Sequence, residues 1–188
     1  MTLSAMSRSG LLRAVDLFDS RVVAATIGNL AMPSPCEGWT ASDVIAHVVS
    51  NLRALRASVD GADFFSVFGQ PVDGDVLDAW HAERLSIAST LEALIDRSIE
   101  TLLVGGNEAP PFVIVDGLMR DLVIHTWDLA RAVGGDERLP ADLVVAATEA
   151  MKMVTDEARG PGLYGYEIAA DPDADAQTRL LAMSGRRT

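Results

Sequence analysis

Asp121 and His125 are the two residues of this chain best placed to act together on one ligand. They are four residues apart, so on a helix their side chains project from the same face. Leu118, Leu122 and Leu129 share that face and are apolar. A carboxylate and an imidazole on an apolar face need partners, because an unpaired buried charge is costly. A divalent metal would satisfy both; for an isolated Asp-x-x-x-His pair, hydrogen bonds to core groups are the commoner explanation.

A second histidine, His47, strengthens the metal interpretation. It recurs at helical spacing with Val44, Val48, Asn51 and Leu55, so a second helix also directs an imidazole toward the core. Three nitrogen and oxygen ligands that leave one position open are typical of catalytic rather than structural zinc. Nickel, iron(II) or manganese would tolerate similar ligands. We therefore predict a divalent metal, zinc before nickel, bound by His47, Asp121 and His125.

Other reactive side chains have plainer explanations. His81 precedes Glu83 and Arg84 near a helix start, which favours a solvated position. Cys36 lies in a proline-rich loop with no histidine adjacent in sequence, so we expect a packed thiol rather than a nucleophile.

The residues just beside these histidines also have structural explanations. Trp127 and Asp128 follow His125 and point away from its face, so we predict packing for the first and a structural hydrogen bond for the second. Asp43 either caps its helix or orients His47, and we favour the cap.

The pattern of apolar residues predicts the helices that carry these side chains. Thr40 and Asp43 approximate a capping box, and Pro140 suits a first helical turn. Residues 32–39 and 60–74 are expected to be loops, with a short strand within residues 163–170. The predicted helices span residues 4–29, 40–58, 75–104, 112–133, 140–158 and 177–183. The predicted fold is an all-α, up-and-down four-helix bundle with short extra helices, minimal strand and antiparallel neighbours.

Length and composition limit the classes of protein. A chain of 188 residues, 49% of them hydrophobic, predicts one domain over residues 1–188. No apolar run reaches the length of a membrane span, and one cysteine gives no internal disulfide, so we expect a cytoplasmic protein. A net charge of −12 with scattered basic residues disfavours nucleic acid.

Three segments resemble one known family. They are PCEGWT at residues 35–40 with Asp43 and His47 after it, DLVIHTWDLA at residues 121–130, and DADAQTRLLAMSGR at residues 173–186. The chain resembles the actinobacterial metal-binding family of the DinB-like superfamily, which includes the N-terminal domain of mycothiol-dependent maleylpyruvate isomerase. The resemblance covers nearly the whole sequence.

This resemblance implies a four-helix bundle with a metal on His47, Asp121 and His125. It also implies mycothiol as a cosubstrate, and hence a mycothiol-dependent transferase or isomerase-like enzyme that acts on a small electrophile. Family members often have His or Glu where this chain has Asp121, so that residue either binds the metal or supports a ligand. A second domain, which the isomerase has, is not expected here, and maleylpyruvate isomerisation is not implied.

Two other classes of function stay open. One is a non-catalytic metal-binding or regulatory interaction protein, and the other is a bundle that has lost its metal. The electrophile is not predicted, and the oligomeric state, monomer or homodimer, stays open as well.

Overall fold

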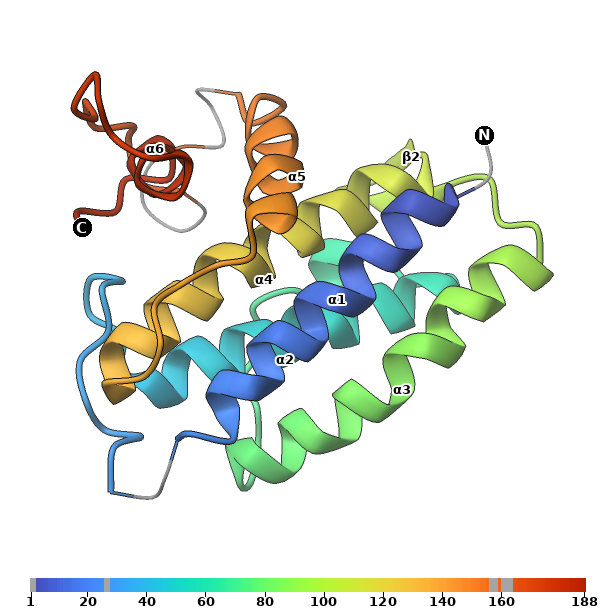
Figure 1. Cartoon of the computed structure of the whole chain (residues 1–188). Helices are drawn as coiled ribbons and strands as arrows, with labels where there is room; N and C mark the ends of the chain where they lie inside the picture. The colour runs from blue at the N-terminus through green and yellow to red at the C-terminus, as the bar shows by residue number, and fades with distance from the viewer. Residues whose placement is uncertain (1–2, 26–27, 156–158, 160–163) are drawn as a thin grey trace.

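The fold is built from four long helices, with two shorter ones near the C-terminus (Figure 1). The computed structural model describes residues 3–25, 28–155, 159 and 164–188. Its elements are α1 (Ala5–Val22), α2 (Ala41–Val59), the 3-10 helix η1 (Phe64–Ser66), α3 (Val76–Asp96), β1 (Leu102–Val104), β2 (Asn107–Ala109), α4 (Pro111–Val133), α5 (Ala141–Met151) and α6 (Ala176–Met183). The predicted all-α four-helix bundle is confirmed.

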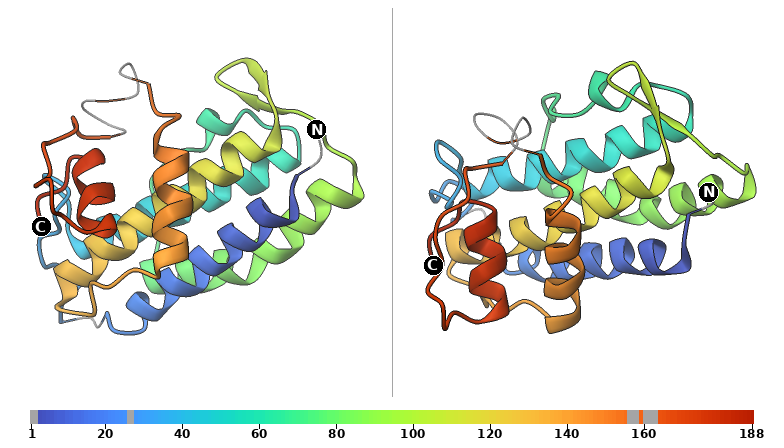
Figure 2. Two further views of the ribbon diagram at one scale, coloured as in Figure 1. Left: turned by 45° about the horizontal axis from the view of Figure 1, so that its top comes forward. Right: turned by 90° about the horizontal axis from the view of Figure 1, so that it is seen from above.

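The order of the helices around the bundle brings α2 and α4 together. Helix α4 packs on both α1 and α2, and α3 packs on α2 and α1. Helix α5 lies across α4, and α6 lies beside α5 (Figure 2). The two helices with the candidate ligands are therefore direct neighbours.

Helices α2 and α3 run in the same direction, which differs from the antiparallel neighbours expected from sequence. Arg53 in α2 bonds Glu83 early in α3, whereas Asp60 just after α2 bonds Arg97 just after α3. Residues 60–75 return the chain along the bundle (Figure 1), so the connection is longer than a tight turn between antiparallel helices.

Local signals set the ends of the two helices that hold the candidate ligands. Helix α2 begins with the predicted capping box, in which Asp43 accepts from the Thr40 N–H and the Thr40 hydroxyl accepts from the Asp43 N–H. Helix α4 starts at Pro111 and ends before Gly134, whose φ of 74° suits a left-handed C-cap. Both helices follow the predicted bounds within two residues.

Some predicted boundaries were wrong. Helix α1 ends at Val22 rather than 29, and residues 26–27 lie outside the described residues. Helix α3 stops at Asp96, and the chain then forms an antiparallel β1–β2 hairpin, whose turn Gly105 and Gly106 make with positive φ. Helix α5 ends at Met151, and within the described part of residues 163–170 the chain forms no strand beyond an isolated bridge at Tyr164.

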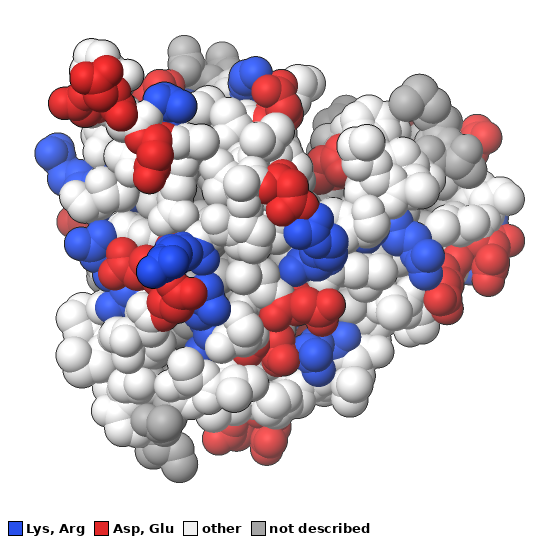
Figure 3. All heavy atoms as spheres, in the orientation of Figure 1, with Lys and Arg blue, Asp and Glu red and all other residues white. Residues whose placement is uncertain are grey.

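Apolar side chains from all four long helices fill one core. Phe18, Trp80 and Trp127 are among its largest fully buried members. On the face drawn in Figure 3, acidic and basic side chains are interspersed rather than gathered into a stripe. None of the described helices combines the length and apolar character needed to cross a bilayer.

Candidate metal centre

The three predicted ligands meet between α2 and α4. The Nε2 atom of His47 lies 3.3 Å from Oδ2 of Asp121, and Nε2 of His125 lies 3.5 Å from Oδ1 of the same carboxylate. Asp121 and His125 are buried, and His47 is half-buried. The ligand atoms lie within 4.8 Å of one another, so one cation could contact all three.

Asn51, one turn after His47, completes the α2 side of this cluster. Its Nδ2 donates to Oδ2 of Asp121 at 2.8 Å and lies 2.9 Å from Nε2 of His47. Its Oδ1 is buried and accepts no hydrogen bond from the described residues. The carboxylate can only accept, so the amide nitrogen must face it, and the amide oxygen is left without a donor.

The other ring nitrogen of His125 is held by a second acid. Oδ2 of Asp128 lies 2.9 Å from Nδ1 of His125, and the Asp128 side chain is fully buried. An Nδ1–H that donates to a carboxylate leaves Nε2 free for a metal and fixes the ring orientation. Asp128 therefore orients the histidine, which is more than the structural hydrogen bond expected from sequence.

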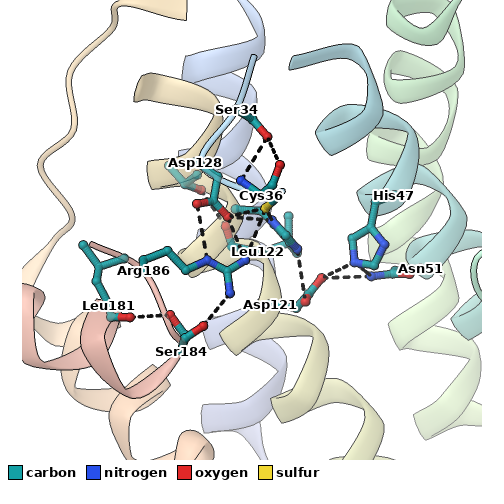
Figure 4. Close-up of polar contacts among 12 residues, drawn as sticks. Ser34, Cys36, His47, Asn51, Asp121, Leu122, Asp128, Leu181, Ser184 and Arg186 are labelled. Atoms are coloured by element: carbon teal, nitrogen blue, oxygen red, sulfur yellow. Dashed lines mark hydrogen bonds and ion pairs between the residues drawn. The ribbon is translucent and has the colours of Figure 1, made fainter. Parts of the chain in front are cut away.

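Cys36 and Arg186 join this cluster from distant parts of the chain. Arg186 Nη2 lies 3.0 Å from Asp128 Oδ2 and 3.4 Å from Cys36 Sγ. Cys36 Sγ lies 3.3 Å from the same carboxylate oxygen and 3.9 Å from Nδ1 of His125. In Figure 4, His47 and Asn51 lie on one side of Asp121, and Cys36, Asp128 and Arg186 on the other.

A close approach between two glycines sets the position of Arg186. Gly185 has a φ of 83°, and a Cβ added to it would lie 2.9 Å from Cα of Gly165 and from the carbonyl oxygen of Tyr166. A side chain would therefore displace the backbone on either side. Glycine at this position allows the C-terminal segment to bring the guanidinium to Asp128.

Burial and charge act in opposite directions on the pKa values of the cluster. Burial alone would raise the pKa of Asp121, but His125 and His47 outweigh it and hold that pKa well below its ordinary value. Burial would lower the pKa of His125, but the Asp121 carboxylate and hydrogen bonds to Asp121, Asp128 and Cys36 raise it well above 6.5. Both shifts therefore favour an imidazolium beside a carboxylate.

Asp128 also has a lowered pKa. Its burial would raise its pKa, but the hydrogen bond to His125 and the charge of Arg186 lower it below the ordinary value. The acid and the arginine thus form a buried ion pair behind the histidine.

Two sets of three side chains are close enough to hold a cation. One is His47, Asp121 and His125, and the other is Cys36, His125 and Asp128. The two sets share His125, the first through Nε2 and the second through Nδ1.

Two cavities reach the cluster. One of about 870 Å³ is lined by His47, Asn51, Asp121 and Tyr164 together with many apolar side chains. The other, about 1010 Å³, lies on the side of Cys36, with His47 and Tyr164 again in its wall. The side chains of His47 and Tyr164 thus border both spaces.

The structure brings the predicted side chains together, but sequence reasoning missed several neighbours. His81 is exposed, as expected, and Trp127 is buried. Cys36 is not merely packed, since its thiol touches the cluster. The i,i+4 spacing of Asn51 from His47 could have identified the amide, whereas no local pattern links residue 186 to residue 128.

Comparison with known proteins agrees with this arrangement. Residues 11–130, more than half of the chain, match the family described as the mycothiol maleylpyruvate isomerase N-terminal domain. The chain belongs to that family. The match contains His47, Asp121, His125 and Asp128 and stops before Arg186.

Relatives from Mycobacterium tuberculosis match this chain over most of its length. The chain is 30% identical to the uncharacterized protein Rv0738 of Mycobacterium tuberculosis strain H37Rv over 176 aligned residues. The alignment covers 93% of this chain and 94% of the relative. The uncharacterized protein MT0763 of strain CDC 1551 / Oshkosh matches with the same identity and coverage. No solved structure gives a significant match.

Proposed function

We propose that this protein binds one divalent cation through His47, Asp121 and His125 and uses it to activate a low-molecular-weight thiol. The observation that carries the proposal is the convergence of these ligand atoms while Asp128 holds the far nitrogen of His125. A carboxylate–histidine–metal arrangement of this kind is common in metalloproteins.

Charge favours this set over the one that contains Cys36. The guanidinium of Arg186 already contacts both Cys36 and Asp128, so a metal there would lie against a fixed positive charge. No described cationic Lys or Arg side chain forms an ion pair with Asp121. Its carboxylate is therefore the acid that a metal would neutralise.

The residues present fit a divalent metal. The donors are two imidazole nitrogens and a carboxylate, which zinc accepts, and nickel would accept as well. The buried amide oxygen of Asn51 lies in the same group and lacks a donor. Three protein ligands leave room for an exogenous ligand, as in catalytic sites.

The thiol chemistry follows from the metal and the family. A bound divalent cation lowers the pKa of a thiol that it contacts, so that the thiolate forms near neutral pH. The thiol proton leaves to solvent, the sulfur forms a bond to an electrophilic carbon, and any leaving group departs with its electron pair. The family name points to mycothiol as the thiol.

The residues of this chain position these reactants. Asp128 keeps His125 oriented, and Asn51 holds Asp121 toward His47. The cavity beside Cys36 is lined by Ser34, Glu37, Arg186 and Arg187 among others, and suits a polar thiol. The cavity of about 870 Å³ would then hold the electrophile.

Metal analysis followed by a thiol assay tests the proposal. Protein purified without added metal should contain close to one equivalent of zinc or nickel by mass spectrometry, and the His125→Ala variant almost none. Loaded protein should then consume mycothiol with at least one member of a panel of alkyl halides, epoxides and enones. Full metal content in the variant would refute the site, and metal without thiol consumption would indicate a binding protein.

A further inference from the structure

The cavity of about 870 Å³ has the size and lining of a small-molecule site. It lies among α1, α4, α5 and η1, and its walls include Phe64, Phe68, Phe112, Ile114 and Leu118. Ligand pockets typically enclose about 300–1,000 Å³ and are mostly apolar with a few polar groups. Its polar lining includes His47, Asn51 and Asp121 of the candidate metal centre.

The rim of this cavity is unusually apolar for a surface. Eleven large hydrophobic side chains are exposed among the described residues, and five of them line this one cavity. They are Met6, Phe65, Val113, Val145 and Met153. A cluster of exposed apolar groups indicates an interaction site, and here the cluster lines a cavity.

The cationic groups in the cavity wall are already engaged. Arg13 pairs with Asp142, and Arg120 donates to the Tyr164 hydroxyl and to the carbonyl oxygen of Ala150. These two arginines are the cations among the described lining residues. Arg120 thus has only neutral partners, but four acids share the lining with the two arginines, so the wall is acidic on balance.

The remaining acids oppose an anion as well. Glu149 pairs with Lys152 at the surface, and Asp116 has no ion-pair partner among the described residues. An anionic ligand would meet more carboxylates than cations in this wall. The cavity therefore favours an uncharged ligand over an anionic one.

Polar side chains close the inner end of the cavity. Asn51 lines it, is 2% exposed and has an amide oxygen that accepts no hydrogen bond from the described residues. Its nitrogen is fixed by Asp121 and faces His47. The amide oxygen is itself inaccessible to solvent, so this end closes the cavity and does not select a polar group.

We propose that this cavity binds the electrophilic substrate, and that this substrate is a neutral molecule with an alkyl or aryl body. The inference rests on the proposed function for its chemistry, but substrate binding can be tested without turnover. It places the two reactants on opposite sides of His47. A neutral substrate would also distinguish this protein from enzymes that act on small dicarboxylates.

Fluorescence titration with the neutral probe N-phenyl-1-naphthylamine tests the cavity. The Val113→Glu and Val145→Glu variants change rim residues that are 48% and 59% exposed, so both should fold. Each buries a charge against a bound apolar molecule and should weaken probe binding about tenfold or more. The matched control, Leu85→Glu, changes a 77% exposed residue of α3 that does not line the cavity, and should bind like the parent.

Competition against the bound probe tests the class of ligand. The alcohols 1-hexanol, 1-octanol and 1-decanol should displace the probe with affinity rising about fourfold per methylene, and maleate should not displace it. The proposal is overturned if maleate competes as well as octanol, or if both rim variants bind the probe like the Leu85→Glu control.

The His125→Ala variant separates this proposal from the metal site. His125 does not line the apolar cavity, so the variant should lose metal and keep the probe affinity of the parent. If it keeps its metal while the rim variants lose the probe, the proposed metal site fails and the substrate cavity stands. If it loses metal and the rim variants still bind the probe, the metal site stands and the substrate cavity fails.

Discussion

The Nδ1 atom of His125 lies 2.9 Å from Oδ2 of Asp128, three residues further along the same helix. This hydrogen bond leaves Nε2 of the ring facing Asp121 at 3.5 Å. The imidazole of His125 thus lies between the carboxylates of Asp121 and Asp128, which have different roles. Asp121 offers its charge to the candidate metal, and Asp128 sets the direction of the ring.

The role of Asp128 can be tested by removing its charge. The Asp128→Asn variant should bind zinc about 10–100-fold more weakly, because the imidazole loses the acceptor that orients it. It should also unfold at a lower temperature, since Arg186 keeps a buried charge without its partner. Zinc titration calorimetry measures the first effect. The Asp116→Asn variant, in the same helix, should bind zinc like the parent, and equal losses in both variants would contradict this role.

The choice between the two ligand sets depends on His47 and Cys36. His47→Ala should abolish zinc binding while leaving a helical protein, because the rest of the core is apolar. Cys36→Ser should keep nearly all of its zinc. The thiol belongs only to the second ligand set, whose negative charge Arg186 already balances. Cobalt(II) substitution adds a spectroscopic check, since a thiolate–cobalt charge-transfer band should be absent from the parent. The reverse pattern would assign the metal to Cys36, His125 and Asp128.

Asp121 is the one acid among the three proposed ligands. Asp121→Asn keeps the size and hydrogen bonds but removes the charge between the histidines, so most of the zinc affinity should be lost. Asp121→Glu lengthens the acid by one methylene and should bind zinc as well as the parent or more tightly. Competition with a chromogenic chelator gives both constants. An Asn variant with parental affinity would mean that Asp121 does not contact the metal.

The stability of metal-free protein should depend on pH through the pair of Asp121 and His125. The folded pKa of His125 is raised, so its contribution is fully present below the unfolded value of about 6.5 and is lost as the pH rises through the folded value. The pKa of Asp121 is lowered, so its contribution is present above the unfolded value of about 3.9 and disappears only in stronger acid.

Melting curves of chelator-treated protein test this pH dependence. The melting temperature should decline above about pH 6.5, and the decline should be smaller in Asp121→Asn. Zinc affinity should rise over the same range, because the metal must displace the proton from His125. A His81→Ala control removes an exposed histidine and should leave both profiles unchanged.

The contact between the parallel helices α2 and α3 can be tested by a substitution at Glu83. Its buried carboxylate accepts from Arg53 at 3.0 Å and from Arg56 at 2.8 Å. Glu83→Gln should lower the free energy of unfolding by about 1–3 kcal/mol, because a buried charged hydrogen-bond acceptor is lost. Asp60→Asn breaks an exposed pair with Arg97 and should cost less than about 1 kcal/mol. Urea denaturation compares the two, and equal losses would contradict the importance of burial.

Local patterns in the sequence predicted what depends on local chemistry. The capping box at Thr40 and the glycine at 134 fixed the ends of α2 and α4, and the i,i+4 spacing placed Asp121 and His125 on one face. Two inward histidines on different helices then predicted their meeting. The single-domain organisation and the identity of the ligands stay predictions.

The rest of the site depends on long-range packing that no periodicity encodes. Cys36 and Arg186 reach Asp128 from 92 and 58 residues away in the sequence. The parallel course of α2 and α3 depends on the path of residues 60–75 over the bundle. The β1–β2 hairpin was missed because its strands, at three residues each, are too short to show alternation.

The contact between Asp128 and Arg186 has a consequence for how this lineage can change by mutation. Losing either residue alone leaves a buried charge without its partner, so single substitutions at these positions should be selected against. The acid lies inside the matched family segment and the arginine beyond it. Descendants that replace the acid should therefore also replace the arginine, and the two positions should be inherited as a pair.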